Sequence, residues 1–267
     1  MRPVAILTLA ALLAILCACS SASQGDAGRS GGEARQRPAD RPTTAPPGPS
    51  PEVLDYVALG DSLAAGVGAD RGYVDRYGAQ LAGNTGIRIR IVNLGVSGQT
   101  SSELLAAVRN DRRVRRALGG AEVVTLNIGL NDLGRAGQAY QSGGCGGEDG
   151  ERCLRAAVDE VGKNWGAIVA EIQSLLRRDD AIVRTPGLGY VPRAGTDAQP
   201  YLDEVNRRIA ATADRNGIPY VEVRLGESGM SPDGIHPNED GYATIAEKLA
   251  ESGYGSLGAE PPGRGRS

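Results

Sequence analysis

Between residues 53 and 250, short apolar runs alternate with longer segments in which apolar residues recur every three or four positions. Nearly continuous apolar runs are typical of strands that are covered on both faces. They predict five strands, at 53–59, 88–93, 122–128, 181–185 and 219–224. Apolar residues that share one side of a helix predict the intervening elements. These helices are expected at 73–81, 101–119, 154–178, 201–216 and 238–250.

Alternating strands and helices predict a parallel α/β sheet with helices on both faces, joined by right-handed crossovers. About 200 residues, 52–254, are enough for one well-buried domain. Ligands of such sheets bind beyond the carboxyl ends of the strands. Candidate polar groups all follow predicted strands and therefore share one edge of the sheet: Ser62, Gly95, Asn131, Asp233 and His236.

Residues 1–19 are typical of an export signal, because the apolar stretch after Arg2 is too short to span a bilayer. The stretch ends in Leu16-Cys17-Ala18-Cys19, which resembles a bacterial lipobox and would make Cys19 a lipid-bearing N-terminus. Ordinary cleavage nearby is the alternative. We therefore expect an extracytoplasmic protein that is either anchored to the cell membrane through lipid or secreted.

Two further segments have compositions that do not favour a packed core. Residues 20–51 are rich in Ser, Gly, Pro, Ala and Arg and predict a disordered tether, and 255–267 predict a disordered tail.

The net charge of −3 argues against a nucleic-acid partner. We expect a monomer.

Two of the four cysteines, Cys145 and Cys153, lie in the predicted domain. An exported protein permits disulfides, so we expect these two to form a bridge that stiffens a glycine-rich loop. A metal site is the alternative, but it is poorly supported because the chain has a single histidine with another expected role.

His236 is the only histidine among 267 residues, so a serine nucleophile with a histidine base has one possible base. The candidate nucleophile is Ser62, in Gly60-Asp61-Ser62-Leu63 after the first strand. A serine hydroxyl is a weak nucleophile until a base takes its proton, and neutral imidazole suits that task. Asp233, three residues before the histidine, could orient the imidazole and stabilise its charge.

Two other strands end in groups that could contact a reacting carbonyl. Gly95 places a backbone amide where the chain can approach a ligand closely. Asn131, in Gly129-Leu130-Asn131-Asp132, places a side-chain amide at the same edge. Taken alone, either could be an ordinary turn. Asp61 and Asp132 are expected to hold their loops by accepting backbone hydrogen bonds.

In this order, Ser62, Gly95, Asn131 and His236 resemble the signature residues of the SGNH, or GDSL, hydrolase family, over residues 53–254. The resemblance implies a flavodoxin-like three-layer α/β/α sandwich with a five-stranded parallel sheet. It also implies ester hydrolysis through a covalent serine ester, with no metal or organic cofactor. The oxyanion would be held by the Ser62 and Gly95 amides and by Asn131. Asp233 would orient the histidine, although some members use a backbone carbonyl instead.

The resemblance leaves the substrate open, because family members include lipases, lysophospholipases, thioesterases, arylesterases and carbohydrate deacetylases. Segments 134–153 and 186–200 are expected to be the loops that shape the pocket. The chain has no Phe and one Trp, and no strongly hydrophobic lid is evident. Short or medium acyl esters, on a small molecule, a lipid or a glycan, are therefore favoured. A non-catalytic lipoprotein that binds an envelope component is the alternative from a different class.

Overall fold

The computed structural model describes residues 53–189 and 199–257. The predicted signal with Cys19, the tether, and the tail from residue 258 onward lie outside the described residues. Part of the predicted loop at 186–200 also lies outside them. Within the two described ranges, no helix combines the length and apolar character that a bilayer crossing requires.

Five parallel strands form one sheet in the order β2-β1-β3-β4-β5. The strands are β1 (Val53–Gly60), β2 (Arg88–Asn93), β3 (Val123–Asn127), β4 (Ile182–Pro186) and β5 (Tyr220–Val221). This order places β1 between β2 and β3. The segments that follow these three strands, and that carry Ser62, Gly95 and Asn131, therefore leave the sheet from neighbouring positions.

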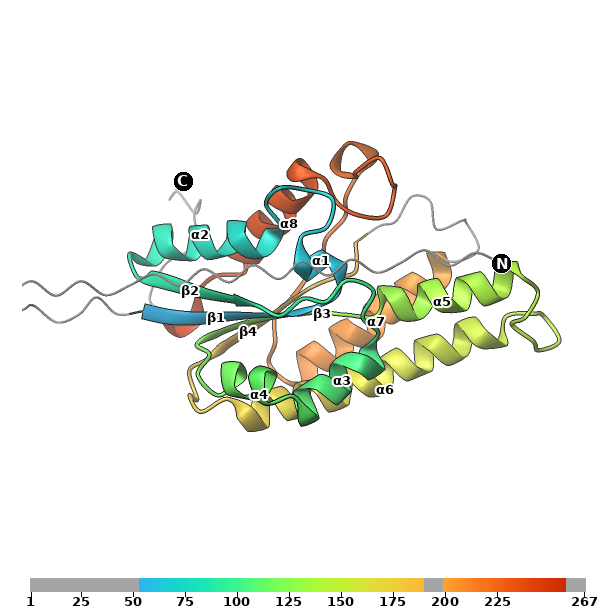
Figure 1. Cartoon of the computed structure of the whole chain (residues 1–267), viewed down its shortest axis with the longest axis horizontal. Coiled ribbons are helices and arrows are strands. Elements are labelled where there is room, and N and C mark those ends of the chain that lie inside the picture. Colours follow the sequence, from blue (N-terminus) through green and yellow to red (C-terminus); the bar gives the residue numbers. More distant parts are fainter. Residues whose placement is uncertain (1–52, 190–198, 258–267) are drawn as a thin grey trace, which may run out of the picture. The chain divides into compact units, whose positions relative to one another are not determined.

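Helices cover both faces of the sheet (Figure 1). On one face, α2 (Tyr73–Thr85) packs beside α8 (Glu239–Glu251). The other face is covered by α3 (Ser101–Asn110), α4 (Arg112–Leu118), α6 (Arg152–Leu175) and α7 (Gln199–Arg215), with α5 (Leu130–Gln141) packed on α6. A short helix, α1 (Ser62–Ala65), follows β1, and 3₁₀ turns lie at Glu227–Gly229 and Gly255–Leu257. The predicted parallel sheet with flanking helices is confirmed.

Alternate residues of β1 face opposite sides of the sheet and belong to two separate hydrophobic cores. Tyr56 and Ala58 pack with α2 and α8, whereas Val57 and Leu59 pack with the helices of the other face. Both sets are fully buried, as expected for a central strand. The indole N–H of the buried Trp165 on α6 donates to the Ile128 carbonyl (2.9 Å), which fixes the end of β3 against that helix.

Three predicted elements differ from the observed ones in more than their end residues. The helix expected at 101–119 is two helices, because the Asp111 side chain accepts the N–H groups of Arg113 and Val114 and starts α4. The expected loop at 134–153 begins as helix, because α5 extends to Gln141. The strand expected at 219–224 pairs over two residues only, since the chain turns from β5 toward the histidine loop.

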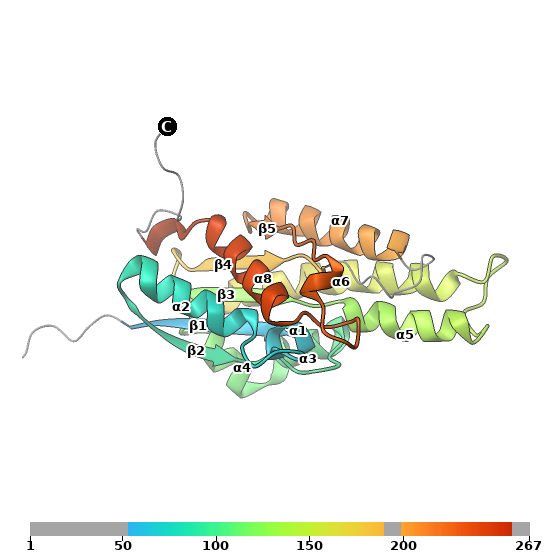
Figure 2. The same cartoon turned by 90° about the horizontal axis from the view of Figure 1, so that it is seen from above.

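Cys145 and Cys153 form the expected disulfide. It closes the turn between α5 and α6, which lie side by side in both views (Figures 1 and 2). Cys145 is buried in a small cluster with Ala136, Leu154 and Ala157, separate from the two main cores. The bridge therefore stabilises a part of the protein that has little core of its own.

Replacing Cys145 and Cys153 together with alanine is expected to lower the free energy of unfolding by about 2–3 kcal/mol, because a short closed loop is released in the unfolded chain. Urea denaturation followed by circular dichroism measures this change. Wild-type protein in a reducing agent is the matched control and should unfold at the same urea concentration as the variant. A variant as stable as the oxidised wild type would contradict the stabilising role.

Candidate active site

Ser62 is the first residue of α1, directly beyond the carboxyl end of β1. The turn into α1 requires Gly60, whose φ is +147° and whose added Cβ would overlap the Asn127 carbonyl oxygen. Asp61 caps the helix by accepting the Leu63 N–H (3.0 Å). A residue at this helical position has no intrahelical acceptor for its own amide. The Ser62 N–H is therefore available to a ligand at the sheet edge.

Asp61 is 1% exposed and belongs to a buried hydrogen-bond network. Its Oδ1 also accepts the Asn127 side-chain amide (3.1 Å), and Asn127 in turn accepts the Tyr73 hydroxyl (2.7 Å). Its Oδ2 has no hydrogen-bond partner among the described residues. Burial raises the pKa of Asp61 to about 6, although hydrogen bonds from Leu63 and Asn127 and the charge of His236 act to lower it.

His236 is oriented by the side chain of Asp233. A carboxylate can only accept, so the ring Nδ1–H donates to Asp233 Oδ2 (2.6 Å). The other oxygen accepts the Ser231 hydroxyl (2.7 Å) and the backbone N–H groups of Ile235 (2.8 Å) and His236 (2.9 Å). Desolvation acts to raise the pKa of Asp233, but the hydrogen bonds from His236, Ile235 and Ser231 hold it well below its usual value. The orienting group is thus the carboxylate and not a backbone carbonyl.

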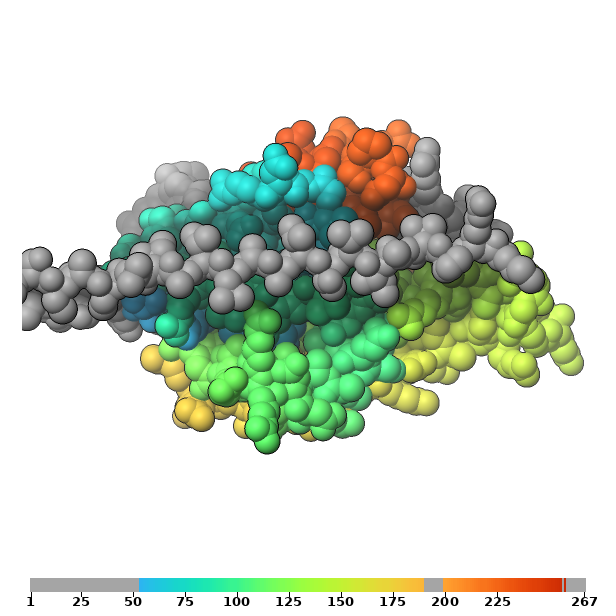
Figure 3. Space-filling model, viewed as in Figure 1, coloured from blue at the N-terminus to red at the C-terminus, as the bar shows by residue number. Residues whose placement is uncertain are grey.

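The segment after Ser62 contacts the histidine loop. The Val67 N–H donates to the Ser62 carbonyl (3.0 Å), and the Val67 carbonyl accepts the Tyr242 hydroxyl of α8 (2.7 Å). An added Cβ on Gly68 would lie 2.9 Å from His236 Cβ and 2.6 Å from the Pro237 carbonyl oxygen. Figure 2 shows the segment before α8 passing beside α1, and the two segments adjoin on the surface in Figure 3. The fold therefore brings the serine and histidine loops together.

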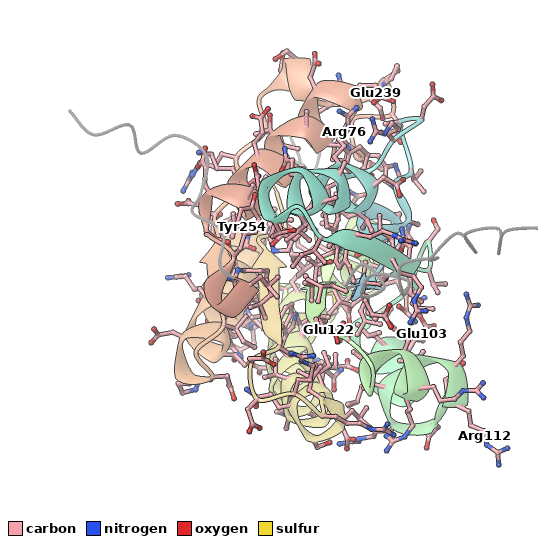
Figure 4. The ribbon with its side chains drawn as sticks, turned by 90° about the vertical axis from the view of Figure 1, so that its left-hand side faces the viewer. Arg76, Glu103, Arg112, Glu122, Glu239 and Tyr254 are labelled. Atoms are coloured by element: carbon pink, nitrogen blue, oxygen red, sulfur yellow. A yellow bond between two sulfur atoms is a disulfide. The ribbon has the colours of Figure 1, made fainter. Side chains whose placement is uncertain are left out.

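Glu239, three residues after the histidine, also links the histidine segment to the segment that follows Ser62, at the protein surface. Its carboxylate accepts the backbone N–H groups of Asp70 (2.6 Å) and Arg71 (3.3 Å). It also pairs with Arg76 of α2, and Figure 4 shows these two side chains next to each other between α2 and α8. One carboxylate thus links the start of α8 to the α1–α2 connection.

Gly95 lies against the serine helix. An added Cβ would lie 2.8 Å from Ala64 Cβ, so only glycine permits this close approach of the β2–α3 loop to α1. Its N–H donates to Asn93 Oδ1 (2.9 Å), so the amide expected to face an oxyanion already has an acceptor in its own loop. Three residues later, Gly98 has a φ of +80°, and its N–H has no acceptor among the residues that the structure describes.

Asn131 lies in the first turn of α5, and its side-chain amide donates one hydrogen to the Gln99 carbonyl (3.0 Å). This bond joins Asn131 to the turn that contains Gly98 and leaves its second amide hydrogen free to donate. Asp132 accepts the Ser101 N–H (2.9 Å) and hydroxyl (2.7 Å), as expected for a residue that holds a loop.

A small apolar pocket of about 30 Å³ adjoins Asp61. Its lining comes from the serine helix, the start of α5, the β4–α7 connection, the histidine loop and α8. The apolar residues among the lining are Leu63, Leu130, Leu188, Leu225, Met230, Ile235, Pro237 and Ile245. The pocket is therefore an apolar recess next to both the serine helix and the histidine loop.

Three residues of this site are not predicted by the sequence pattern: Tyr73, Asn127 and Gly98. Tyr73 lies in a predicted helix and Asn127 inside a predicted strand, so neither position differs from an ordinary core position until the fold is known. Gly98 did carry a signal, because it lies in the turn just before the helix that Thr100 caps.

Known proteins resemble this chain in sequence and in fold. The GDSL-like lipase/acylhydrolase family model matches residues 58–244. The spore germination lipase LipC of Bacillus licheniformis is 28% identical, over 77% of this chain and 99% of its own. An acetylxylan esterase of Xylanibacter ruminicola is 24% identical, over 76% of this chain and 44% of its own.

Among solved structures, the lipase Lip_vut3 from a goat rumen metagenome has a TM-score of 0.69 and 27% identity, covering 76% of this chain and 99% of its own. The family match extends over more than half of the chain and includes Ser62, Asn131, Asp233 and His236. The chain therefore belongs to the GDSL-like lipase/acylhydrolase family and is a carboxylic ester hydrolase.

Proposed function

We propose that the protein hydrolyses esters of short or medium carboxylic acids through a covalent acyl-enzyme on Ser62. The observation that carries the mechanism is the 2.6 Å pair of Asp233 and His236, on a loop in contact with the serine segment. The geometry of such a pair, in which an acid orients a base beside a hydroxyl, is suited to acyl transfer.

In this mechanism Ser62 Oγ attacks the ester carbonyl while His236 takes the hydroxyl proton. Asp233 stabilises the imidazolium that results. The imidazolium then gives its proton to the leaving alcohol as the bond from carbon to the alcohol oxygen breaks. Water repeats the sequence on the acyl-enzyme, with His236 again the base, and releases the acid and the free serine.

The tetrahedral intermediate needs donors for its negative oxygen. The Ser62 N–H and the second hydrogen of the Asn131 side chain supply two. We assign the third to the Gly98 N–H instead of the expected Gly95. The Gly95 amide is already bonded to Asn93, whereas Gly98 adjoins the residue that binds Asn131.

The apolar pocket supports a preference for small acyl groups. The recess is small, about 30 Å³, which favours a short acyl chain over a long one. Ile235 lines this pocket and is 49% exposed, so a few additional methylenes could lie against it outside the recess. The names of the two relatives, a lipase and an acetylxylan esterase, fit acyl groups from either lipids or glycans.

The location that the sequence predicts is also part of the proposal. The lipobox-like Leu16-Cys17-Ala18-Cys19 supports an extracytoplasmic protein that is lipid-anchored at Cys19 or secreted. The Cys145–Cys153 disulfide supports this location independently, because such bonds persist in oxidising compartments.

A panel of p-nitrophenyl esters from acetyl to palmitoyl tests the proposed substrate class. We expect kcat/KM to be highest between acetyl and about hexanoyl and to fall at least about 10-fold by palmitoyl, because the longer chain finds no buried surface. A fluorophosphonate probe should label wild-type protein at Ser62. A steady rise toward palmitoyl would contradict the acyl preference. Folded protein that neither labels nor hydrolyses any ester would instead favour an envelope-binding role.

A further inference from the structure

The α1–α2 connection, residues 66–72, follows the nucleophile directly, and little in its own sequence fixes its position. Residues 66, 68 and 72 are glycines, which restrict the backbone less than other residues do. Of the whole connection only Gly72 is buried, so its side chains have few contacts with the core. The position of the connection therefore depends on contacts that other segments make with it.

The start of this connection is bonded to the backbone of the nucleophile. The Val67 N–H donates to the Ser62 carbonyl (3.0 Å), and the Gly66 N–H donates to the Leu63 carbonyl (3.3 Å). These bonds join the four-residue helix α1 and the start of the connection into one unit. A displacement of the connection would therefore also displace Ser62.

The other side of the connection lies against the segment that begins at His236. An added Cβ on Gly68 would lie 2.9 Å from His236 Cβ, so the connection and the histidine are in direct contact. Six residues after the histidine, the hydroxyl of the buried Tyr242 donates to the Val67 carbonyl (2.7 Å). The connection is thus bonded to the serine on one side and packed against the histidine on the other.

Glu239 makes a further contact with the connection, and an ordinary role at a helix terminus does not explain it. An acidic side chain in the first turn interacts favourably with the helix dipole. The Asn238 side chain, however, already accepts two N–H groups of that turn. The Glu239 carboxylate instead accepts the N–H groups of Asp70 (2.6 Å) and Arg71 (3.3 Å) and pairs with Arg76 (Figure 4). Its hydrogen bonds therefore hold the connection and not its own helix.

We propose that Glu239 is a positioning residue for the hydrolysis: by holding the α1–α2 connection against the histidine loop, it fixes the place of the Ser62 hydroxyl relative to the His236 imidazole. Proton transfer requires the two side chains to come within hydrogen-bond reach. A misplacement of about 1 Å can lower a rate roughly 100-fold, so bonds remote from the reacting atoms can control it. This inference rests on the proposed function and adds to it a residue that acts through the two loops.

Glu239→Ala and Glu239→Gln test the proposal together. With p-nitrophenyl acetate, we expect kcat/KM of Glu239→Ala to fall roughly 10- to 100-fold, and the rate of fluorophosphonate labelling to fall with it. Glu239→Gln keeps an acceptor oxygen for the Asp70 and Arg71 amides, so its kcat/KM should lie within about 5-fold of the wild type. A role of the charge alone, toward the helix dipole or Arg76, predicts equal losses in both variants.

A double variant shows whether the effect acts through the base. Without the imidazole there is nothing to position, so adding Glu239→Ala to His236→Ala should change the residual kcat/KM by less than about 2-fold. A loss that came from the oxyanion donors or from substrate binding would persist. Glu251→Ala is the matched control. Glu251 is also an exposed glutamate of α8, but its basic partner, Lys248, lies on the same helix, so this variant should keep wild-type kcat/KM.

The outcomes separate this inference from the proposed function. Three results overturn the inference alone: folded Glu239→Ala with wild-type kcat/KM, Glu239→Gln as impaired as Glu239→Ala, or a loss that persists in the His236→Ala background. If Glu239→Ala does not fold, Tyr242→Phe tests the same connection by removing only the bond to the Val67 carbonyl. Full activity then overturns the inference, and a loss that disappears in the His236→Ala background supports it. Wild type that shows neither hydrolysis nor Ser62 labelling overturns both proposals.

Discussion

Replacing Ser62 with alanine is expected to lower kcat/KM for p-nitrophenyl acetate by roughly 10⁶-fold, to a small residual rate above that of water. The fold should not change, because the Ser62 side chain has no structural hydrogen bond among the described residues and alanine is favourable in a helix. The residual rate would come from the oxyanion donors and from binding, which the substitution leaves in place.

Ser97→Ala is the matched control for this experiment. Ser97 lies at the same edge of the sheet, in the exposed loop after β2, and the mechanism assigns it no proton transfer. Its variant should keep kcat/KM within a few-fold of the wild type and should still react with the fluorophosphonate probe. Ser62→Ala protein that retains more than about 1% of wild-type activity, with circular dichroism unchanged, would remove Ser62 from the role of nucleophile.

The sequence predicted β1 and β3 well, because burial on both faces leaves a clear apolar pattern. Val53–Gly60 and Val123–Asn127 are fully or largely buried, and both were predicted within one or two residues. Helix α5 was missed because Gly134 and Gly137 weaken its helical pattern. Its inward-facing Leu133, Ala136 and Tyr140 become evident only against α6.

The base of the site was predictable because histidine occurs only once in the sequence. A single histidine with an aspartate three residues before it left one possible base, and the 2.6 Å bond between Asp233 and His236 follows from that spacing. The Asp61–Asn127–Tyr73 network was not predictable, since its bonds join residues 66 and 54 positions apart. The choice between Gly95 and Gly98 likewise depends on which amide is already bonded, and a sequence does not contain that information.

Replacing His236 with alanine is expected to lower kcat/KM about as much as Ser62→Ala, roughly 10⁶-fold, and to abolish labelling of Ser62, because no other histidine can take the serine proton. Ser62→Ala and His236→Ala both prevent the same step, the attack of a deprotonated serine on the ester. The double variant Ser62→Ala with His236→Ala should therefore be no less active than either single variant.

Asp233→Asn should cost less, roughly 10⁴-fold, because the base remains and loses only its orienting carboxylate. The asparagine can still accept the amides of Ile235 and His236, so the loop is expected to keep its shape. A larger loss of kcat/KM in His236→Ala than in Asp233→Asn therefore distinguishes removal of the base from loss of its orientation. A loss in Asp233→Asn equal to that in His236→Ala, in folded protein, would mean that the carboxylate does more than orient the imidazole and stabilise its charge. The proton between Asp233 and His236 would then have to take part in the reaction itself.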